Sequence, residues 1–160
     1  MTQVLAPLAG RVLPLAEVPD PVFAAAVVGA GVAIDPCEGR ATVVAPVPGR
    51  LVKLHPHAFA VLTADGSGVL VHLGIDTVRM AGDGFTLHVE EGAQVATGDA
   101  IVSWDPAHVQ ATGRSPVCPV VALDTRPEQI SEVARSGPVE VGGPLFRTGT
   151  VEGDRRPRMR

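Results

Sequence analysis

Short apolar runs separated by turn residues recur along nearly the whole chain. The runs are rich in Val, Ala, Leu and Ile, and Gly, Pro, Asp or Ser stand between them. Many short runs at near-regular spacing are typical of an antiparallel β-sandwich. The pattern predicts strands within residues 4–7, 10–15, 31–34, 41–46, 51–54, 58–62, 69–73, 85–89, 100–104, 117–123, 139–141 and 145–151.

Helical periodicity is scarce in this sequence. Its best instance is residues 127–136, where apolar residues lie on one helical stripe before the Gly-Pro pair at residues 137–138. A shorter turn of helix is expected after Asp105-Pro106. The predicted fold class is therefore all-β, a compact antiparallel β-sandwich or barrel-like domain with one or two short helices.

Length and composition bound the architecture. The chain has 160 residues with 46% hydrophobic content, which suits one compact domain, expected over residues 1–151. Aromatic residues make up only 3%, so the core must be built from aliphatic side chains. Residues 152–160 are rich in arginine and are expected to form a disordered basic tail, with a weak anchor for anions as the alternative.

Charge and cysteine usage exclude some classes of function. A formal net charge of −4 argues against nucleic-acid binding, which needs a basic face. Cys37 and Cys118 do not form a Cys-x-x-Cys pair, and the amino terminus lacks the pattern of a secretory signal peptide. We expect reduced cysteines and a cytoplasmic protein. No apolar stretch approaches the ~20 residues that span a bilayer, so the protein is not expected to be embedded in a membrane.

Two histidines flank a strong turn signal. His72 stands among strand-forming residues, and His57 lies fifteen positions earlier. A two-residue turn at 64–65 would put His57 opposite His72, and one at 65–66 would make them diagonal neighbours on the same face. Either register brings the imidazoles together, whereas an odd-length loop or a bulge would send them to opposite faces.

Residues 45–52 and 90–99 both look like hairpin turns that bring two backbone segments close together. They resemble the turns of biotinyl and lipoyl carrier domains, in which similar phrases bracket a modified lysine. Lys53 is the only lysine here, and it lies in a strand-like run instead of on a hairpin tip. The resemblance therefore indicates hammerhead-type hairpins and not that carrier function.

Six phrases, in order along the chain, together resemble one family. They are residues 19–23, 28–34, 45–49, 57–59, 71–78 and 92–99. The family is the glucose-type enzyme IIA component of the bacterial phosphoenolpyruvate-dependent sugar phosphotransferase system, and the match runs from about Val4 to about Val151. It implies a phosphocarrier without a cofactor. Its implied partners are the phosphorylated histidine-containing carrier protein, which donates the phosphoryl group, and the IIB domain of a glucose- or N-acetylglucosamine-type permease, which receives it on a cysteine.

The resemblance also assigns roles to particular residues. His72 is the implied phosphoryl acceptor, and His57 is its partner in onward transfer. Asp76 and Asp20 are expected to have either a functional role, in which they shape the electrostatics of the site or bind an arginine of a partner, or a structural one, in which they cap local structure. Gly74 is expected to keep the rim of the site low enough for a histidine or cysteine of another protein to approach. The implied apolar docking rim consists of Val22, Phe23, Val28 and Leu70. The alternative for these four residues is a place in the core.

An imidazole suits reversible phosphoryl transfer near neutral pH. Its unperturbed pKa near ~6.5 makes it a nucleophile that is not permanently protonated and needs no separate base. One ring nitrogen should donate to a backbone carbonyl, which fixes the tautomer and directs the lone pair of the other nitrogen. A second imidazole can then donate a hydrogen bond to a phosphoryl oxygen as the group moves.

Two positions depart from the family pattern. Ala30 stands where the family usually has Asp, and His55 stands where it usually has Thr. We expect His55, His88 and His108 to be ordinary surface histidines.

A second class of function is a zinc-binding module or a zinc endopeptidase-like domain. His55, His57, His72 and Asp76 would then supply the ligands. The sequence lacks the further His and Asp settings of lysostaphin-type endopeptidases, which share a related architecture. A regulatory binding module that reports the phosphorylated state is compatible with the phosphocarrier interpretation.

Overall fold

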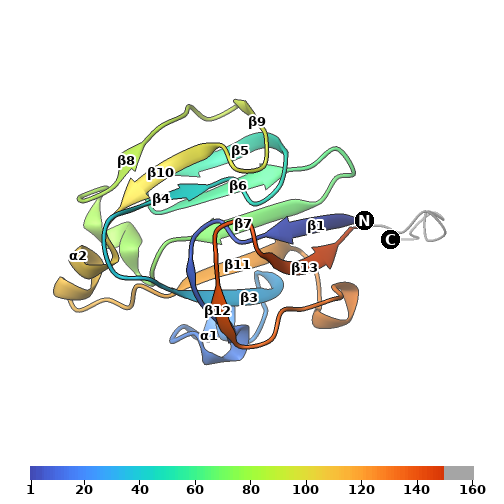
Figure 1. Cartoon of the computed structure of the whole chain (residues 1–160), viewed down its shortest axis with the longest axis horizontal. Coiled ribbons are helices and arrows are strands. Elements are labelled where there is room, and N and C mark those ends of the chain that lie inside the picture. The colour runs from blue at the N-terminus through green and yellow to red at the C-terminus, as the bar shows by residue number, and fades with distance from the viewer. Residues whose placement is uncertain (150–160) are drawn as a thin grey trace.

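Antiparallel β-strands dominate the computed structural model, which describes residues 1–149 (Figure 1). The strands are β1 (Thr2–Leu5), β2 (Gly10–Pro14), β3 (Gly29–Pro36), β4 (Ala41–Val44), β5 (Gly49–His55), β6 (Ala58–Leu62), β7 (Gly68–His72), β8 (Thr86–Leu87), β9 (Gln94–Val95), β10 (Ala100–Trp104), β11 (Cys118–Leu123), β12 (Gly137–Val139) and β13 (Pro144–Thr148). The helices are α1 (Pro21–Ala24) and α2 (Pro106–Ala111), with the 3-10 helices η1 (Leu15–Glu17), η2 (Thr77–Met80) and η3 (Pro127–Gln129).

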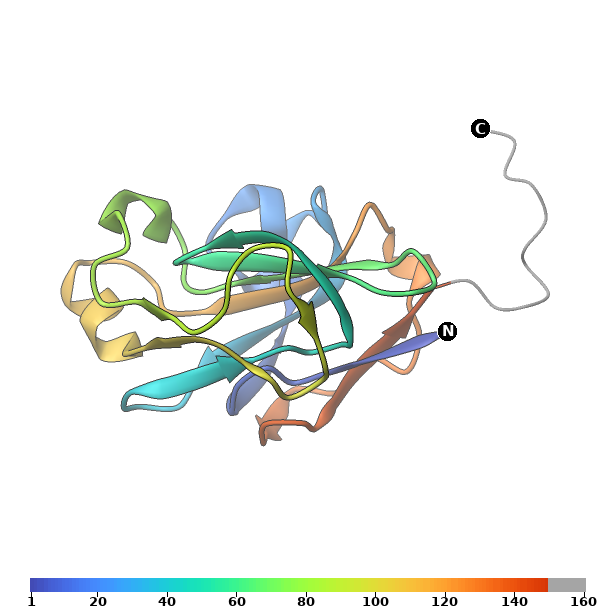
Figure 2. The ribbon, with the colours of Figure 1, turned by 90° about the horizontal axis from the view of Figure 1, so that it is seen from above.

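The strands form three antiparallel sheets. The large sheet has the order β12-β2-β3-β11-β7-β6-β5-β9, the second has the order β4-β10-β8, and β1 pairs with β13. Figure 2 shows the β4–β10 pair below the β5–β6 hairpin, as a separate layer. The prediction of an antiparallel all-β fold with short helices is confirmed. The sheets formed by residues 1–149 are open, and none closes into a barrel.

The large sheet separates two apolar layers, as alternation along β7 shows. Val69 and Val71 are fully buried on one face, whereas Leu70 and His72 lie partly exposed on the other. The first face packs on the main core, whose largest buried side chains include Trp104, Phe59 and Phe146. The second face carries a smaller cluster of Leu15, Val18, Phe23, Ala33, Ile75 and Val121. His72 therefore projects from the face that bears the smaller cluster.

Helix α1 covers part of this smaller cluster. The carboxylate of Asp20 accepts hydrogen bonds from the N–H groups of Val22 and Phe23, and Pro21 occupies a first-turn position that needs no N–H partner. The chain leaves the helix through Ala26, which has a φ of 58°. The helix has only four residues, too few for the apolar pattern to reveal it.

The predicted helix over residues 127–136 is wrong. Only the single turn η3 forms there, and Glu132 interrupts helical geometry with a φ of 50°. Backbone hydrogen bonds instead tie Ser131 and Ala134 to β13. Hydrogen bonds to β13 satisfy N–H and C=O groups that would otherwise bond within a helix. The segment is therefore irregular, although its apolar residues have helical spacing.

The other predicted elements lie close to the observed ones. Helix α2 follows Asp105 as predicted, while residues 85–89 contribute only the short strand β8. Residues 45–52 and 90–99 pair with each other through β5 and β9. The expected basic tail at residues 152–160 lies outside the described residues. No helix within residues 1–149 is long and apolar enough to cross a membrane.

Candidate histidine site

Three histidine rings lie side by side at one end of the β6–β7 hairpin. The ring centroids of His57 and His72 are 5.3 Å apart with the planes at 69°, an edge-to-face contact. The rings of His55 and His57 are stacked, with centroids 5.6 Å apart and planes at 22°. Phe23 packs edge-on against His72, also at 5.3 Å. The structure thus brings the two predicted site histidines together and adds His55, which was expected to be an ordinary surface residue.

The register between β6 and β7 differs from both predicted registers. Ala58 lies opposite His72, and the loop over residues 63–67 has an odd length. In a regular ladder this parity would place His57 on the opposite face from His72. His57 instead occupies the turn between β5 and β6, outside the ladder, and its ring contacts His72 from there. The imidazoles are therefore adjacent for a different reason from the predicted one.

A hydrogen bond holds His72 in one tautomer. Its Nδ1 lies 2.6 Å from the carbonyl oxygen of Gly74. Because a carbonyl oxygen can only accept, Nδ1 carries the proton and Nε2 carries the lone pair. Burial lowers the pKa of His72, whereas the bond to Gly74 and the negative charge of Asp20 act against this lowering. His72 is therefore a neutral imidazole near neutral pH, with a lone pair on Nε2.

Gly74 lies beneath the histidines and not on the rim, because it is buried. Its φ of 78° belongs to the left-handed region that glycine adopts without strain. A Cβ at this position would lie 2.7 Å from Cγ2 of Thr77 and 3.0 Å from the carbonyl oxygen of Ser115. The absent side chain thus lets the backbone turn tightly and present its carbonyl to His72.

His57 is half-buried, and its environment disfavours a positive charge. Burial and the neighbouring His72 and His55 lower the pKa of His57 from 6.5 to about 4. A neutral imidazole keeps one N–H donor and one lone pair. Among residues 1–149 no group forms a hydrogen bond with this ring, so the N–H is available to a group placed on His72.

The two predicted aspartates differ in their relation to the site. Asp20 caps α1 and also acts electrostatically on His72, so both expected interpretations apply to it. The carboxylate of Asp76 instead accepts a hydrogen bond from Nε of Arg79 at 3.1 Å, and its backbone oxygen accepts one from Nε of Arg114 at 3.1 Å. Asp76 therefore organises the exposed segment that follows Gly74.

The predicted rim residues differ widely in exposure. Val22 is 47% exposed and Phe23 is 9% exposed, while Val28 and Leu70 are partly buried against the smaller cluster. Val27, which sequence reasoning missed, is 71% exposed and its N–H donates to the carbonyl of Val22. Residues after α1 thus extend an exposed apolar surface beside the histidines. Val22 and Val27 stand on either side of Phe23 and three alanines, a segment too short to give a periodic signal for such a surface.

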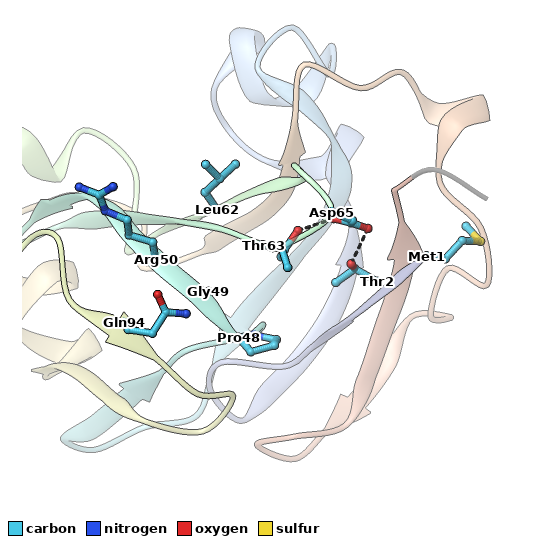
Figure 3. A pocket seen from close by; sticks show the side chains of 10 residues that line it. Met1, Thr2, Pro48, Gly49, Arg50, Leu62, Thr63, Asp65 and Gln94 are labelled. Carbon is cyan, nitrogen blue, oxygen red and sulfur yellow. Dashed lines mark hydrogen bonds between the residues drawn. The ribbon is translucent and has the colours of Figure 1, made fainter. Parts of the chain in front are cut away.

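A hollow of about 630 Å³ lies at the turn end of the β6–β7 hairpin (Figure 3). The histidines lie at the opposite end of this hairpin. Arg50, Leu62 and Gln94 are among the residues that line it. Asp65 closes one side, where it accepts hydrogen bonds from Thr2 and Thr63. These bonds join the first strand to the β6–β7 loop, so the polar groups on this side of the hollow already have protein partners.

Cys118 lies close to the backbone of Gly74, the residue that holds His72. Cys37 is exposed and Cys118 is buried, and both are free thiols, as expected. Burial raises the pKa of Cys118 to about 12, so this thiol stays protonated.

The zinc alternative has no support in the structure. Residues 1–149 contain no group of three or more His, Cys, Asp or Glu side chains placed to hold a metal ion. The stacked rings of His55 and His57 have planes only 22° apart, and lone pairs in nearly parallel ring planes do not converge on one ion.

Comparison with known proteins agrees with the class that the fold and site define, a β-rich carrier domain with paired histidines. The model of the family described as phosphoenolpyruvate-dependent sugar phosphotransferase system, EIIA 1, matches residues 2–127. The chain belongs to this family of phosphotransferase components, which confirms the resemblance seen in the sequence.

Similar proteins cover most of the chain. The PTS system glucose-specific EIIA component of Bacillus cereus is 44% identical over 124 residues, which are 76% of this chain and 74% of that protein. The component of the same name from Halalkalibacterium halodurans is 40% identical over 152 residues, 94% of this chain and 87% of that one. The solved structure of glucose permease IIA from Mycoplasma capricolum matches with a TM-score of 0.81 at 34% identity and covers 90% of this chain and 93% of that chain.

Proposed function

We propose that Nε2 of His72 accepts a phosphoryl group and passes it to a second protein, with His57 assisting the transfer. The donor is the phosphorylated histidine-containing carrier protein, and the recipient is a cysteine in the IIB domain of a glucose- or N-acetylglucosamine-type permease, both reached from the cytoplasm. Family membership supports the reaction class. The hydrogen bond from Nδ1 of His72 to Gly74 carries the assignment, because it leaves Nε2 as the nucleophile.

In the first step the lone pair of Nε2 attacks phosphorus in line with the leaving ring. The new bond joins Nε2 to phosphorus, and the broken bond returns its electron pair to the donor's imidazole. The proton on Nδ1 stays in place, so the phosphorylated His72 ring carries positive charge. The carbonyl of Gly74 and the carboxylate of Asp20 support that charge, and no separate base is needed.

In the second step a cysteine thiolate of the recipient attacks the same phosphorus atom. The bond from phosphorus to Nε2 breaks, and its electron pair returns to His72, which becomes the neutral tautomer again. His57 donates its N–H to a phosphoryl oxygen and stabilises the charge that moves between nitrogen and sulfur. The ring contact between His57 and His72 supports this role.

Exposed valines beside the histidines suit two partners in turn. Val22 and Val27 present apolar surface next to Phe23, which contacts His72. Apolar burial is non-directional, so different protein surfaces can use the same contact while the phosphoryl group sets the orientation. The rim we propose is Val22, Phe23, Val28 and Leu70, extended by Val27.

The test is incubation with phosphoenolpyruvate, enzyme I and the carrier protein, followed by mass spectrometry of the intact chain. One acid-labile, base-stable phosphate is expected on the wild type and on His88→Ala, the matched control, and none on His72→Ala. A label that persists in His72→Ala would place the acceptor elsewhere.

For His57→Gln we expect the label to enter normally and to leave slowly to the IIB domain. The loss of one aligned donor predicts a rate lower by roughly 10²-fold. Onward transfer at the wild-type rate would remove His57 from the mechanism.

A further inference from the structure

The ring of His57 is held without any hydrogen bond. Its backbone oxygen accepts from the N–H of Leu73, which fixes the main chain in the turn. Neither ring nitrogen bonds to another group within residues 1–149, in contrast to His72, which is tied to Gly74. Two rotatable side-chain bonds would let an unsupported imidazole adopt several orientations. Packing must therefore set the direction in which its N–H points.

His55 is placed to supply that packing. It is the last residue of β5 and pairs with Ala58, which in turn lies opposite His72. Opposed residues share a sheet face, so His55 and His72 project from the same face on either side of Ala58. The ring of His57 contacts both, with His55 nearly parallel to it and His72 nearly perpendicular.

We infer that His55 is a positioning residue for the proposed phosphoryl transfer. Its stacked ring fixes the plane of His57, so that the N–H of His57 faces the phosphoryl group on His72. The effect of this contact on transfer rests on the proposed function. The contact itself rests on the ladder that places His55 and on the stacking geometry.

The contact depends on a flat ring and not on hydrogen-bonding capacity. The side chain of His55 is exposed and forms no hydrogen bond or ion pair within residues 1–149, so stacking on His57 is its one specific contact there. Offset stacking is a general property of planar aromatic side chains. Phenylalanine at this position should therefore preserve the plane of His57, whereas alanine should release it.

Two variants separate these possibilities, with His88→Ala as the control at an exposed histidine outside the site. Each protein is first labelled at His72, and the rate of phosphoryl transfer to an isolated IIB domain is then measured. His55→Ala is expected to slow this step roughly ten-fold, and His55→Phe to stay within about two-fold of the wild type, because donor alignment and not substrate binding is lost. All three variants should accept the label to the wild-type extent.

A spectroscopic measurement tests the positioning without any reaction. Nuclear Overhauser contacts between ring protons of His57 and His72 are expected in the wild type and in His55→Phe, and they should weaken or vanish in His55→Ala. A purely structural contribution of His55 would change thermal stability and leave these contacts in place.

The outcomes keep this inference separate from the proposed function. Wild-type transfer by His55→Ala, or equal slowing in His55→Phe and His55→Ala, would overturn it. Failure of the wild type to accept a label at His72 would reject the proposed function instead. In that case the Overhauser contacts still decide whether His55 orients His57.

Discussion

Ala58 lies directly opposite His72 in the β6–β7 ladder, and its methyl group is buried. Opposed Cβ atoms on antiparallel strands are ~4.5–5.5 Å apart, so a larger side chain at this position would meet the imidazole. The smallest side chain with a Cβ therefore stands where it leaves the site histidines free to approach each other.

Replacing Ala58 with leucine tests this relationship. Ala58→Leu is expected to slow the phosphorylation of His72 roughly ten-fold by displacing its ring, while overpacking costs about 1–3 kcal/mol of stability. Ala60→Leu is the matched control, since Ala60 is equally buried on the same face of β6 but lies opposite Leu70. Initial labelling rates and thermal unfolding distinguish the two variants. Equal slowing in both would show that the effect is general and not local to His72.

Gly74→Ala is expected to reduce both stability and phosphorylation. The left-handed φ costs about 1–2 kcal/mol for a residue with a Cβ, and the close contacts with Thr77 and Ser115 add about 1–3 kcal/mol. Gly92→Ala is the control, because Gly92 has a φ of 95° but open space around its missing Cβ. Urea unfolding should show a larger loss for Gly74→Ala. Equal losses would mean that packing beneath the histidine contributes nothing.

The stability of the free protein should depend on pH through His57. Its pKa is about 4 in the folded protein against 6.5 for an unperturbed imidazole, so the unfolded chain binds more protons in this range. The contribution is complete above pH 6.5 and is lost as the pH falls toward 4. Denaturant unfolding should therefore show a shallower decline for His57→Gln than for the wild type. Parallel declines would contradict the lowered pKa.

Asp65 should also contribute stability that is lost on protonation, but at a lower pH than His57. Burial would raise the pKa of Asp65, but hydrogen bonds from Thr63, Thr2 and Ser67 outweigh it and lower the pKa to about 2. The stabilisation is present above pH 3.8 and is lost as the pH falls through about 2. Asp65→Asn is expected to lose about 1 kcal/mol at neutral pH. Glu140→Gln, at an exposed carboxylate, is the control, and equal stability of the two variants would contradict the prediction.

Val27→Asp should weaken partner docking without weakening the fold. Val27 is 71% exposed, so its substitution removes little buried surface. We expect a higher KM for the carrier protein with an unchanged kcat and an unchanged unfolding midpoint. Val133→Asp is the control, an exposed valine outside the proposed rim. A similar rise in KM for both variants would remove Val27 from the docking surface.

The sequence predicted most strands because apolar runs bounded by Gly and Pro report the local pattern of burial. The segment at residues 127–136 shows the limit of that signal. Its apolar residues do have helical spacing, but backbone hydrogen bonds to β13 determine its conformation. Arg147, which pairs with Ser131, lies 16 residues further along the chain. Local periodicity carries no information about such distant partners.

The proximity of the two imidazoles was predicted more accurately than the geometry that produces it. His57 and His72 do lie together, yet the predicted ladder register was wrong, because a five-residue loop and a two-residue turn cannot be distinguished by turn-forming residues alone. His55 was missed for a similar reason. Its contact with His57 depends on a tight turn between β5 and β6, which a single intervening proline signals only weakly.

The pairing of β1 with β13 has a practical consequence for protein engineering. Thr2 lies opposite Thr148 and also bonds to Asp65 in the β6–β7 loop. Strand β7 separates this loop from His72 by roughly 17 Å. A short linker joining the two strands would yield a circular permutant with new ends in a distant turn, such as the one around Gly92. Fluorescent labels or affinity handles attached beside Thr2 would likewise leave the imidazoles accessible to visiting proteins.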